Sequence, residues 1–233
     1  VVAGNYYEQF GNGLLLRSYE NKALGYDNSL EGVKVKYHPH DAVTLKGLIG
    51  RQRSFFDLGP GIVRGFDAEV NMNRLFKSRS DAVTQYILGG SFVSKYQKDE
   101  NPVFKLPQNV GAFSGRFTVN HKMLNVSGEY AYKINDPSTQ NEYIYKDGNA
   151  LLLNASYSKA GFGVFLGVKR VDNMSFRSDR NATLNNLKIN YLPPITKTHS
   201  YSLAGMYPYA TQPVGEMGLQ TEITYNIKRG SAI

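Results

Sequence analysis

Pairs of alternating segments joined by short turns constrain the fold of this chain more than any other feature. Residues 149–158 and 161–170 flank Lys159-Ala160, and both carry an apolar residue at every second position. If Lys159-Ala160 is a hairpin turn, opposed residues have numbers that sum to about 319. Opposed residues of an antiparallel ladder share a face. One face of the hairpin is then apolar and contains Leu151, Leu153, Tyr157, Phe162, Val164, Leu166 and Val168.

Two further hairpins show the same separation into an apolar and a polar face. Residues 120–123 connect one pair of alternating segments, and residues 38–42 connect another. In the first of these hairpins, Phe117 is expected opposite Val126 on the apolar side. The agreement among the hairpins predicts an antiparallel β-structure in which each strand has two chemically different faces.

The lengths of the connections distinguish two all-β architectures. A soluble sandwich and a membrane barrel both have strands with alternating apolar and polar residues. Connections that alternate along the chain between short turns and longer loops are typical of outer-membrane barrels. Strands of about 9–11 residues, long enough to cross a bilayer, point the same way. About thirteen strands are predicted, at residues 2–10, 14–18, 32–38, 42–51, 62–72, 84–96, 109–119, 124–133, 149–158, 161–170, 185–192, 199–207 and 216–228.

The predicted fold is therefore a single all-β domain over residues 1–233, an antiparallel up-and-down transmembrane β-barrel. Its size is about 12–14 strands or more. Single-chain bacterial barrels have even strand numbers, so an odd count suggests that the barrel is incomplete in this chain. In this fold the apolar face of the 149–170 hairpin is predicted to contact lipid.

Composition agrees with a barrel in which every second residue faces water. The mean hydropathy is −0.39, and no run of about 18 apolar residues could form a transmembrane helix. The chain has 17 Tyr and no Cys, which excludes disulfides and thiol chemistry. Tyrosines suit the membrane interface, where the ring meets hydrocarbon and the hydroxyl stays in water. They are equally good strand formers, and both interpretations remain open here.

Two histidine motifs are candidates for a metal site or a catalytic site. His38-Pro39-His40-Asp41 contains potential metal ligands, but its Pro and Asp are ordinary turn residues where the hairpin reverses. His199 and Ser200 are adjacent, and neighbouring strand residues point to opposite faces, so they cannot form a catalytic dyad in a regular strand. We therefore expect no enzymatic activity, no metal and no cofactor.

Charged residues on the polar faces of the strands are predicted to line the lumen. We expect Lys34 opposite Lys46, and Lys46 next to either Asp67 or Glu69 on the following strand. Such a charge ladder can seal a narrow barrel or line an aqueous pore, and we favour sealing. The predicted ladder contains Lys34, Lys36, Lys46, Asp67, Glu69, Arg116 and Glu129.

The net charge of +8 does not indicate nucleic-acid binding, because the basic residues are spread over loops and strand faces and form no recognised module. External basic groups would meet anionic lipopolysaccharide, or they are simply solvated loop charges. The basic residues considered external are Arg51, Arg53, Lys98, Arg170, Arg177 and Arg180. The expected partners are outer-membrane lipid, lipopolysaccharide and protein components of the envelope.

Two stretches carry a resemblance to known proteins. They run from Gly4-Asn5-Tyr6-Tyr7-Glu8-Gln9-Phe10-Gly11 to Tyr19-Glu20, and from Tyr207-Pro208-Tyr209-Ala210-Thr211-Gln212-Pro213 to Glu216. The chain resembles an uncharacterised family of outer-membrane β-barrel proteins from Bacteroidota. The resemblance implies a location in the outer membrane of a Gram-negative bacterium, and it supplies no catalytic residues.

Three functional hypotheses follow. The first is a structural or accessory subunit of a larger envelope assembly for secretion, uptake or barrel insertion, motivated by the lack of a catalytic constellation. The second is a passive channel for small solutes, motivated by the charged lumen face. The third is a soluble secreted β-sandwich that binds glycans through its tyrosines.

Overall fold

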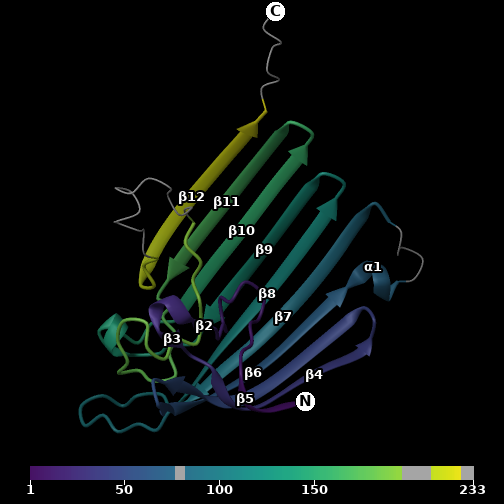
Figure 1. Cartoon of the computed structure of the whole chain (residues 1–233). Helices are drawn as coiled ribbons and strands as arrows, with labels where there is room; N and C mark the ends of the chain where they lie inside the picture. Colours follow the sequence, from purple (N-terminus) through teal and green to yellow (C-terminus); the bar gives the residue numbers. More distant parts are fainter. Residues whose placement is uncertain (77–81, 196–210, 227–233) are drawn as a thin grey trace, which may run out of the picture.

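The computed structural model describes residues 1–76, 82–195 and 211–226 and consists mainly of one antiparallel 10-stranded sheet (Figure 1). The strands of this sheet are β1 (Val2–Tyr6), β4 (Leu30–His40), β5 (Val43–Ser54), β6 (Asp57–Asn71), β7 (Thr84–Tyr96), β8 (Asn109–His121), β9 (Leu124–Lys133), β10 (Gly148–Lys159), β11 (Phe162–Asp172) and β12 (Gly215–Tyr225). A small separate sheet joins β2 (Glu20–Asn21) to β3 (Tyr26–Asp27). The helices of the described residues are short: α1 (Met72–Leu75) and two 3-10 turns at Lys22–Leu24 and Thr139–Asn141. None of these described helices is long and apolar enough to cross a membrane.

The sheet has a simple order in which each strand from β4 to β12 pairs with its neighbours along the chain, and β1 pairs with β4. The prediction of an antiparallel all-β fold is thus confirmed. Within the described residues, β1 and β12 are the two edges, and the sheet does not close into a barrel (Figure 1). The strands from β4 to β12 have 10 to 15 residues, well above the roughly 5–6 of an average strand.

The predicted register of the 149–170 hairpin is wrong by two residues. Tyr157 lies opposite Val164, because the turn is formed by Ala160 and Gly161 and not by Lys159-Ala160. Gly161 adopts a φ of 78°, a left-handed conformation that glycine reaches without strain. A shift of two residues leaves every side chain on its predicted face, since the side-chain period of a strand is two.

The β8–β9 hairpin shows the same kind of correction. Phe117 lies opposite Gly128 instead of Val126, because the turn tightens to Lys122 and Met123. Lys122 has a φ of 50° in this turn. In both hairpins the apolar pattern predicted correctly which residues share a face. The register depends instead on which turn residue adopts the positive φ.

In the β4–β5 hairpin the like-charged pair is Lys36 with Lys46, and the predicted pairing of Lys34 with Lys46 is wrong. The register is again displaced by two, and a bulge separates Tyr37 from the last pair of the hairpin. On the next strand, Lys46 lies opposite Asp67, one of the two predicted alternatives.

Several predicted strands and loops are absent from the described sheet. Residues 14–18 and 185–192 form irregular segments that make only isolated bridges, and the first strand ends at Tyr6 instead of residue 10. The long connection predicted at 52–61 is a tight turn at 55–56. The predicted strand at 199–207 lies outside the described residues. Three consecutive leucines at 14–16 are all buried, which is not possible in a strand that has one face exposed, because successive side chains point to opposite faces.

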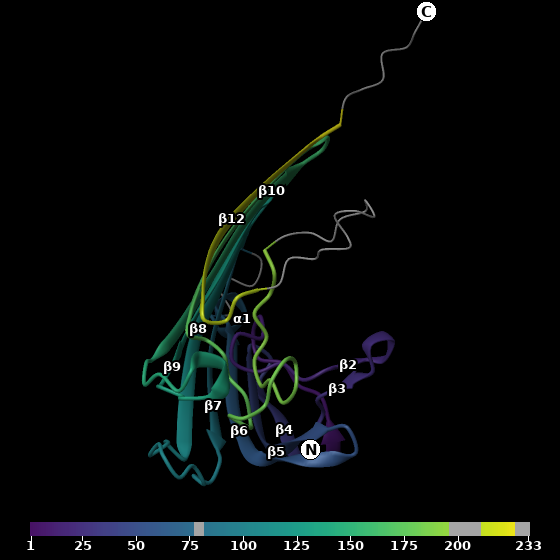
Figure 2. The same cartoon turned by 90° about the vertical axis from the view of Figure 1, so that its left-hand side faces the viewer.

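The sheet is curved, and the loops cover only one of its faces (Figure 2). We call the covered side the inner face and the other side the outer face. The covering comes mainly from residues 7–29 and 173–195, which we call the loop layer. Because the strands are antiparallel, the connections after β1, β7, β9 and β11 all leave from the same end, the loop end of the sheet. The apolar core lies between the inner face and the loop layer and includes Phe10, Leu14, Leu15, Val93, Val110, Met174, Phe176 and Ile189.

Candidate functional site

The outer face is a continuous apolar surface across the strands from β4 to β12. The register places all seven residues that were predicted to face lipid on this surface. Aromatic rings meet across neighbouring strands, as in Phe92 and Phe113, whose centroids are 5.0 Å apart. Its exposed large apolar side chains are Val33, Val35, Tyr37, Ile49, Phe66, Tyr86, Leu88, Phe92, Phe113, Phe117, Leu124, Tyr130, Tyr132, Tyr157, Phe162, Leu166, Met217, Leu219, Ile223 and Tyr225.

In water such a surface is unfavourable, and soluble monomers seldom expose an apolar patch that extends across a whole sheet. The side chains of β12 are the most exposed, with 77% of Met217 and 69% of Leu219 accessible. No described strand or helix covers this face (Figure 2). Its chemistry suits contact with hydrocarbon or with another apolar surface.

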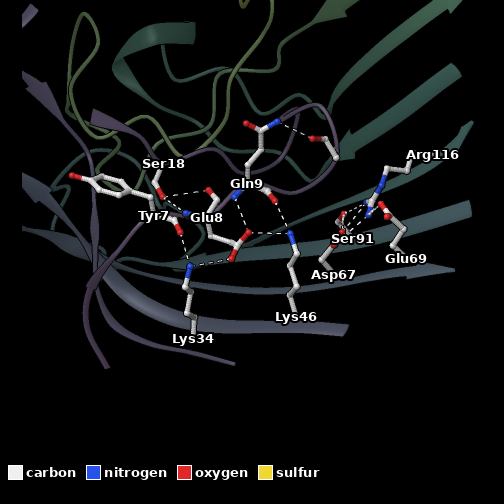
Figure 3. A network of polar contacts seen from close by, with 11 residues as sticks. Tyr7, Glu8, Gln9, Ser18, Lys34, Lys46, Asp67, Glu69, Ser91 and Arg116 are labelled. Atoms are coloured by element: carbon white, nitrogen blue, oxygen red, sulfur yellow. Dashed lines mark hydrogen bonds and ion pairs between the residues drawn. The ribbon is translucent and has the colours of Figure 1, made fainter. Parts of the chain in front are cut away.

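The inner face carries the predicted charge ladder, and its centre is a fork between Arg116 and Asp67 (Figure 3). The two Nη atoms of Arg116 donate to the two Asp67 oxygens at 2.7 and 3.2 Å, and Nη2 also donates to Glu69 at 3.2 Å. The Ser91 hydroxyl donates to Asp67 at 2.6 Å. Asp67 is buried, so this bidentate pairing compensates for its lost hydration. The structure therefore brings together three of the predicted ladder residues from β6 and β8.

Glu8 is a member of the ladder that sequence reasoning missed. Its carboxylate lies 2.9 Å from Lys46 Nζ and 3.3 Å from Lys34 Nζ (Figure 3). Burial raises the pKa of Glu8, but the hydrogen bond and charge of Lys46 outweigh burial, so that the net shift is downward from the ordinary value of 4.5. The excess of lysine on the β4–β5 hairpin was the available signal that a carboxylate must approach it. Lys36, the third lysine, is exposed.

The carboxylate of Glu129 also receives hydrogen bonds from the segment that follows β1. It accepts hydrogen bonds from the backbone N–H of Asn12 at 2.7 Å and from its side-chain amide at 2.9 Å. Gly11 has a φ of 51°, and a Cβ at this position would lie 2.6 Å from a Glu129 oxygen. Only glycine allows this approach without displacing the carboxylate. Residues 7–18, which we call the plug segment, are thus attached to the inner face at both Glu8 and Asn12.

Deeper pairs connect the sheet to the loops at the loop end. Lys95 Nζ lies 2.7 Å from Asp136, and the two side chains are 0% and 2% exposed. Lys169 on β11 pairs with Glu216 on β12, and its Nζ also donates to the carbonyl of Pro193 at 3.0 Å and to the hydroxyl of Thr211 at 3.1 Å, both in the connection between these strands. Ion pairs this deeply buried add little net stability but strongly disfavour arrangements that separate their partners. The Lys95–Asp136 pair therefore holds the connection after β9 on the inner face, and the hydrogen bonds of Lys169 to Pro193 and Thr211 hold the connection after β11.

The basic residues considered external are divided by the structure. Arg177 and Arg180 are each 2% exposed, so the prediction that they face the exterior is wrong. Arg177 donates to main-chain carbonyls, and Arg180 donates to the carbonyl of Pro107, because loop backbone needs such partners when it is buried. Arg53 pairs with Asp27 at 3.4 Å. The exposed members are Arg51, Lys98 and Arg170.

The histidine motifs contribute local contacts. His40 accepts a hydrogen bond from the backbone of Ala42 at 3.0 Å, and His38 lies 3.1 Å from the hydroxyl of Thr44. Across the described part of the chain, no three His, Asp or Glu side chains are grouped closely enough to hold a metal ion. His199 and Ser200 lie outside the described residues.

Comparison with protein-family models gives one match over the whole chain. A family of unknown function (DUF6029) matches residues 1–233, and the chain belongs to this family. Comparisons with curated proteins and with solved structures find no match.

Proposed function

We propose that this member of the family forms part of the wall of a transmembrane β-barrel in the outer membrane of a Gram-negative bacterium of the Bacteroidota. In this role it serves as a structural or accessory subunit of an envelope assembly for secretion, uptake or barrel insertion. The observation that carries the proposal is the exposed apolar outer face, which continues across nine neighbouring strands. Transmembrane strands alternate apolar residues toward lipid with polar residues toward the interior, and an apolar outer face with charged residues on the inner face agrees with that pattern.

The inner face favours a closed interior over an open conduit. Charges that would line an aqueous lumen are instead neutralised by the plug segment or by each other, as Glu8 does for Lys34 and Lys46. The loop layer also buries an apolar core against the same face. Protein partners and lipopolysaccharide would contact the loop end, which we place outside the cell.

A passive channel is the second candidate, and one observation supports it. Near the turns of β8, β9 and β10, the inner face presents partly exposed polar side chains, among them Asn125, Ser127, Asn154 and Ser156. A polar wall of this kind would tolerate water. The third hypothesis, a soluble sandwich, requires a second sheet over the apolar face, and none of the described strands lies there.

Membrane integration is tested by fractionating cells that express the chain. We expect the protein to remain with the membranes after alkaline carbonate washing and to dissolve only in detergent. Recovery in the soluble fraction, with an apolar face covered by another protein or a second copy, would contradict the proposal.

Topology and closure need two further measurements. Because the chain has no cysteine, Ile144→Cys at the loop end and Lys159→Cys at the turn end can be labelled on intact cells with an impermeant maleimide. We expect labelling of Ile144→Cys alone. Purified protein in planar bilayers should give little current, whereas large and steady single-channel currents would favour the channel.

A further inference from the structure

A cavity of about 300 Å³ lies within the loop layer, between residues 17–28, which include the end of the plug segment, and the segment around Tyr191. This volume is at the lower end of the range for small-molecule sites, which is about 300–1,000 Å³. Its walls combine aromatic rings, amides and two cations, and none of the lining residues is acidic. The cavity is separate from the charge ladder, and its interpretation does not depend on the membrane proposal.

Arg17 is the central feature of this cavity. The carbon of its guanidinium lies 4.0 Å from the centre of the Tyr191 ring and 4.8 Å from that of Tyr19. Cation–π contacts of this kind hold the planar group in place while leaving its N–H donors available in the plane. Within the described residues, the Arg17 side chain makes no ion pair.

A second cation strengthens the positive potential of the cavity. Lys188 donates to the amide oxygen of Asn185 at 2.8 Å and has no carboxylate partner among the described residues. Burial lowers the pKa of Lys188, and the charge of Arg177 lowers it further. Asp27, which lies between the lining residues Tyr26 and Asn28, is engaged with Arg53 and with the hydroxyl of Tyr7. The cavity is therefore complementary to an anion.

Buried asparagines fix the two walls of the cavity relative to each other. The Asn28 amide donates to the carbonyls of Arg17 and Lys188 at 3.4 and 3.2 Å, and its oxygen accepts from the Tyr19 N–H at 2.7 Å. Asn190 similarly connects its segment to the carbonyl of Met174 at 2.8 Å. Both asparagines are buried. A site whose walls are already held together by hydrogen bonds loses little conformational entropy when a ligand binds.

We propose that this cavity binds an anionic saccharide, meaning a sugar ring that carries a carboxylate or a phosphate. The N–H fork of Arg17 takes the anionic group in a bidentate contact, and Lys188 adds charge. The tyrosine rings face the apolar side of the sugar, while Asn185 and the tyrosine hydroxyls meet its hydroxyl groups. A neutral sugar would leave the cations without a partner, so the site discriminates by charge.

Binding is tested by calorimetry on the full chain in detergent. The probes are digalacturonic acid, glucose 6-phosphate, their neutral counterparts and inorganic phosphate. We expect saturable binding of at least one acidic sugar, with the neutral sugar and phosphate alone weaker by about tenfold or more. Equal affinity for the neutral sugar, equal affinity for inorganic phosphate, or saturation by neither acidic sugar would overturn the proposal.

Variants locate the binding in this cavity. Arg17→Leu should weaken binding by about tenfold or more, and Arg17→Lys should fall between it and the wild type because an ammonium keeps the charge without the fork. Lys98→Gln, which removes an exposed cation at the same end of the sheet, should bind like the wild type. A folded Arg17→Leu variant with unchanged affinity would contradict the assignment.

If Arg17→Leu does not fold, substitutions of Tyr191 decide the question. Tyr191→Phe keeps the ring beside Arg17 and should retain most of the affinity, whereas Tyr191→Leu should lose it. Equal affinities for these two variants would overturn the proposed role of the ring. Lipopolysaccharide micelles added as a competitor distinguish the source of the sugar. Displacement of the probe identifies a membrane glycolipid, and its retention identifies a soluble saccharide.

Discussion

The two faces of the sheet are built from the same strands, yet one exposes apolar side chains and the other buries charged ones. On the outer face, large apolar side chains remain exposed. On the inner face, buried charges such as Asp67 and Lys95 each have a partner on another element. The outer face therefore depends on its surroundings, whereas most of the charges on the inner face have partners within the chain.

This difference shows which features of the fold are encoded within a single strand and which require residues distant in the sequence. An apolar surface needs only an alternating pattern within each strand, because hydrophobic contact has no fixed direction. A buried charge needs a specific partner at a specific distance. On the inner face those partners arrive from loops, as Asn12 reaches Glu129 across 117 positions of the chain.

The largest expected effect comes from charging the outer face. Leu153 lies on the outer face of β10, and its neighbour Asn154 lies on the inner face. In lipid vesicles, Leu153→Arg should lower the free energy of unfolding by about 2–4 kcal/mol if the residue is near the bilayer midplane. Asn154→Arg is the matched control and should lower the free energy of unfolding much less. Urea unfolding measures both, and the reverse order would mean that the inner face contacts lipid.

A bulky residue under the loop layer should have the next largest effect. Gly61 lies on the inner face of β6, where an added Cβ would meet the carbonyl oxygen of Ser178 at 1.9 Å. Gly61→Val should therefore destabilise the fold by about 1–3 kcal/mol, because the backbone of the loop must move. At Gly115, on the outer face, nothing lies within 4 Å of an added Cβ, and Gly115→Val should be tolerated. Equal costs measured by urea unfolding would contradict the close contact between the loop layer and the sheet.

The plug segment provides a smaller, pH-dependent effect. Glu8→Gln removes the charge that neutralises Lys34 and Lys46, and should cost about 1–2 kcal/mol at neutral pH. The pKa of Glu8 in the folded protein is below 4.5, so its contribution is complete above that pH and disappears as the pH falls through the lower folded value. The difference in the free energy of unfolding between wild type and variant should accordingly disappear at acidic pH.

The control for this experiment is Glu100→Gln, which removes an exposed carboxylate that pairs with the equally exposed Lys98. Its effect on the free energy of unfolding should be small at every pH, because surface ion pairs are weak. A pH-independent cost for Glu8→Gln would show that the side chain acts by shape and hydrogen bonding alone, and not by its charge.

The antiparallel strands and their faces were predictable from alternation, and so was the presence of Arg116, Asp67 and Glu129 on the same side. The registers were not, because a positive φ at a single residue such as Gly161 moves a ladder by two positions without changing the faces. Nor could the plug segment be predicted. Its buried leucines look like part of a strand in sequence, and its contacts are long-range and specific to geometry.

The smallest expected effect tests the corrected register of the β4–β5 hairpin. Lys36 lies directly opposite Lys46, a like-charge pair that disfavours the hairpin, while Lys34 lies opposite Leu48. Lys36→Glu should therefore raise the free energy of unfolding by about 0.2–1 kcal/mol. Lys36→Gln removes only the repulsion and should give a smaller gain. Both gains should fade at about 1 M salt, where charges are screened within about 3 Å. If Lys34→Glu stabilises the protein and Lys36→Glu does not, then Lys34 is the residue opposite Lys46, and the register of the inner face differs from the one described.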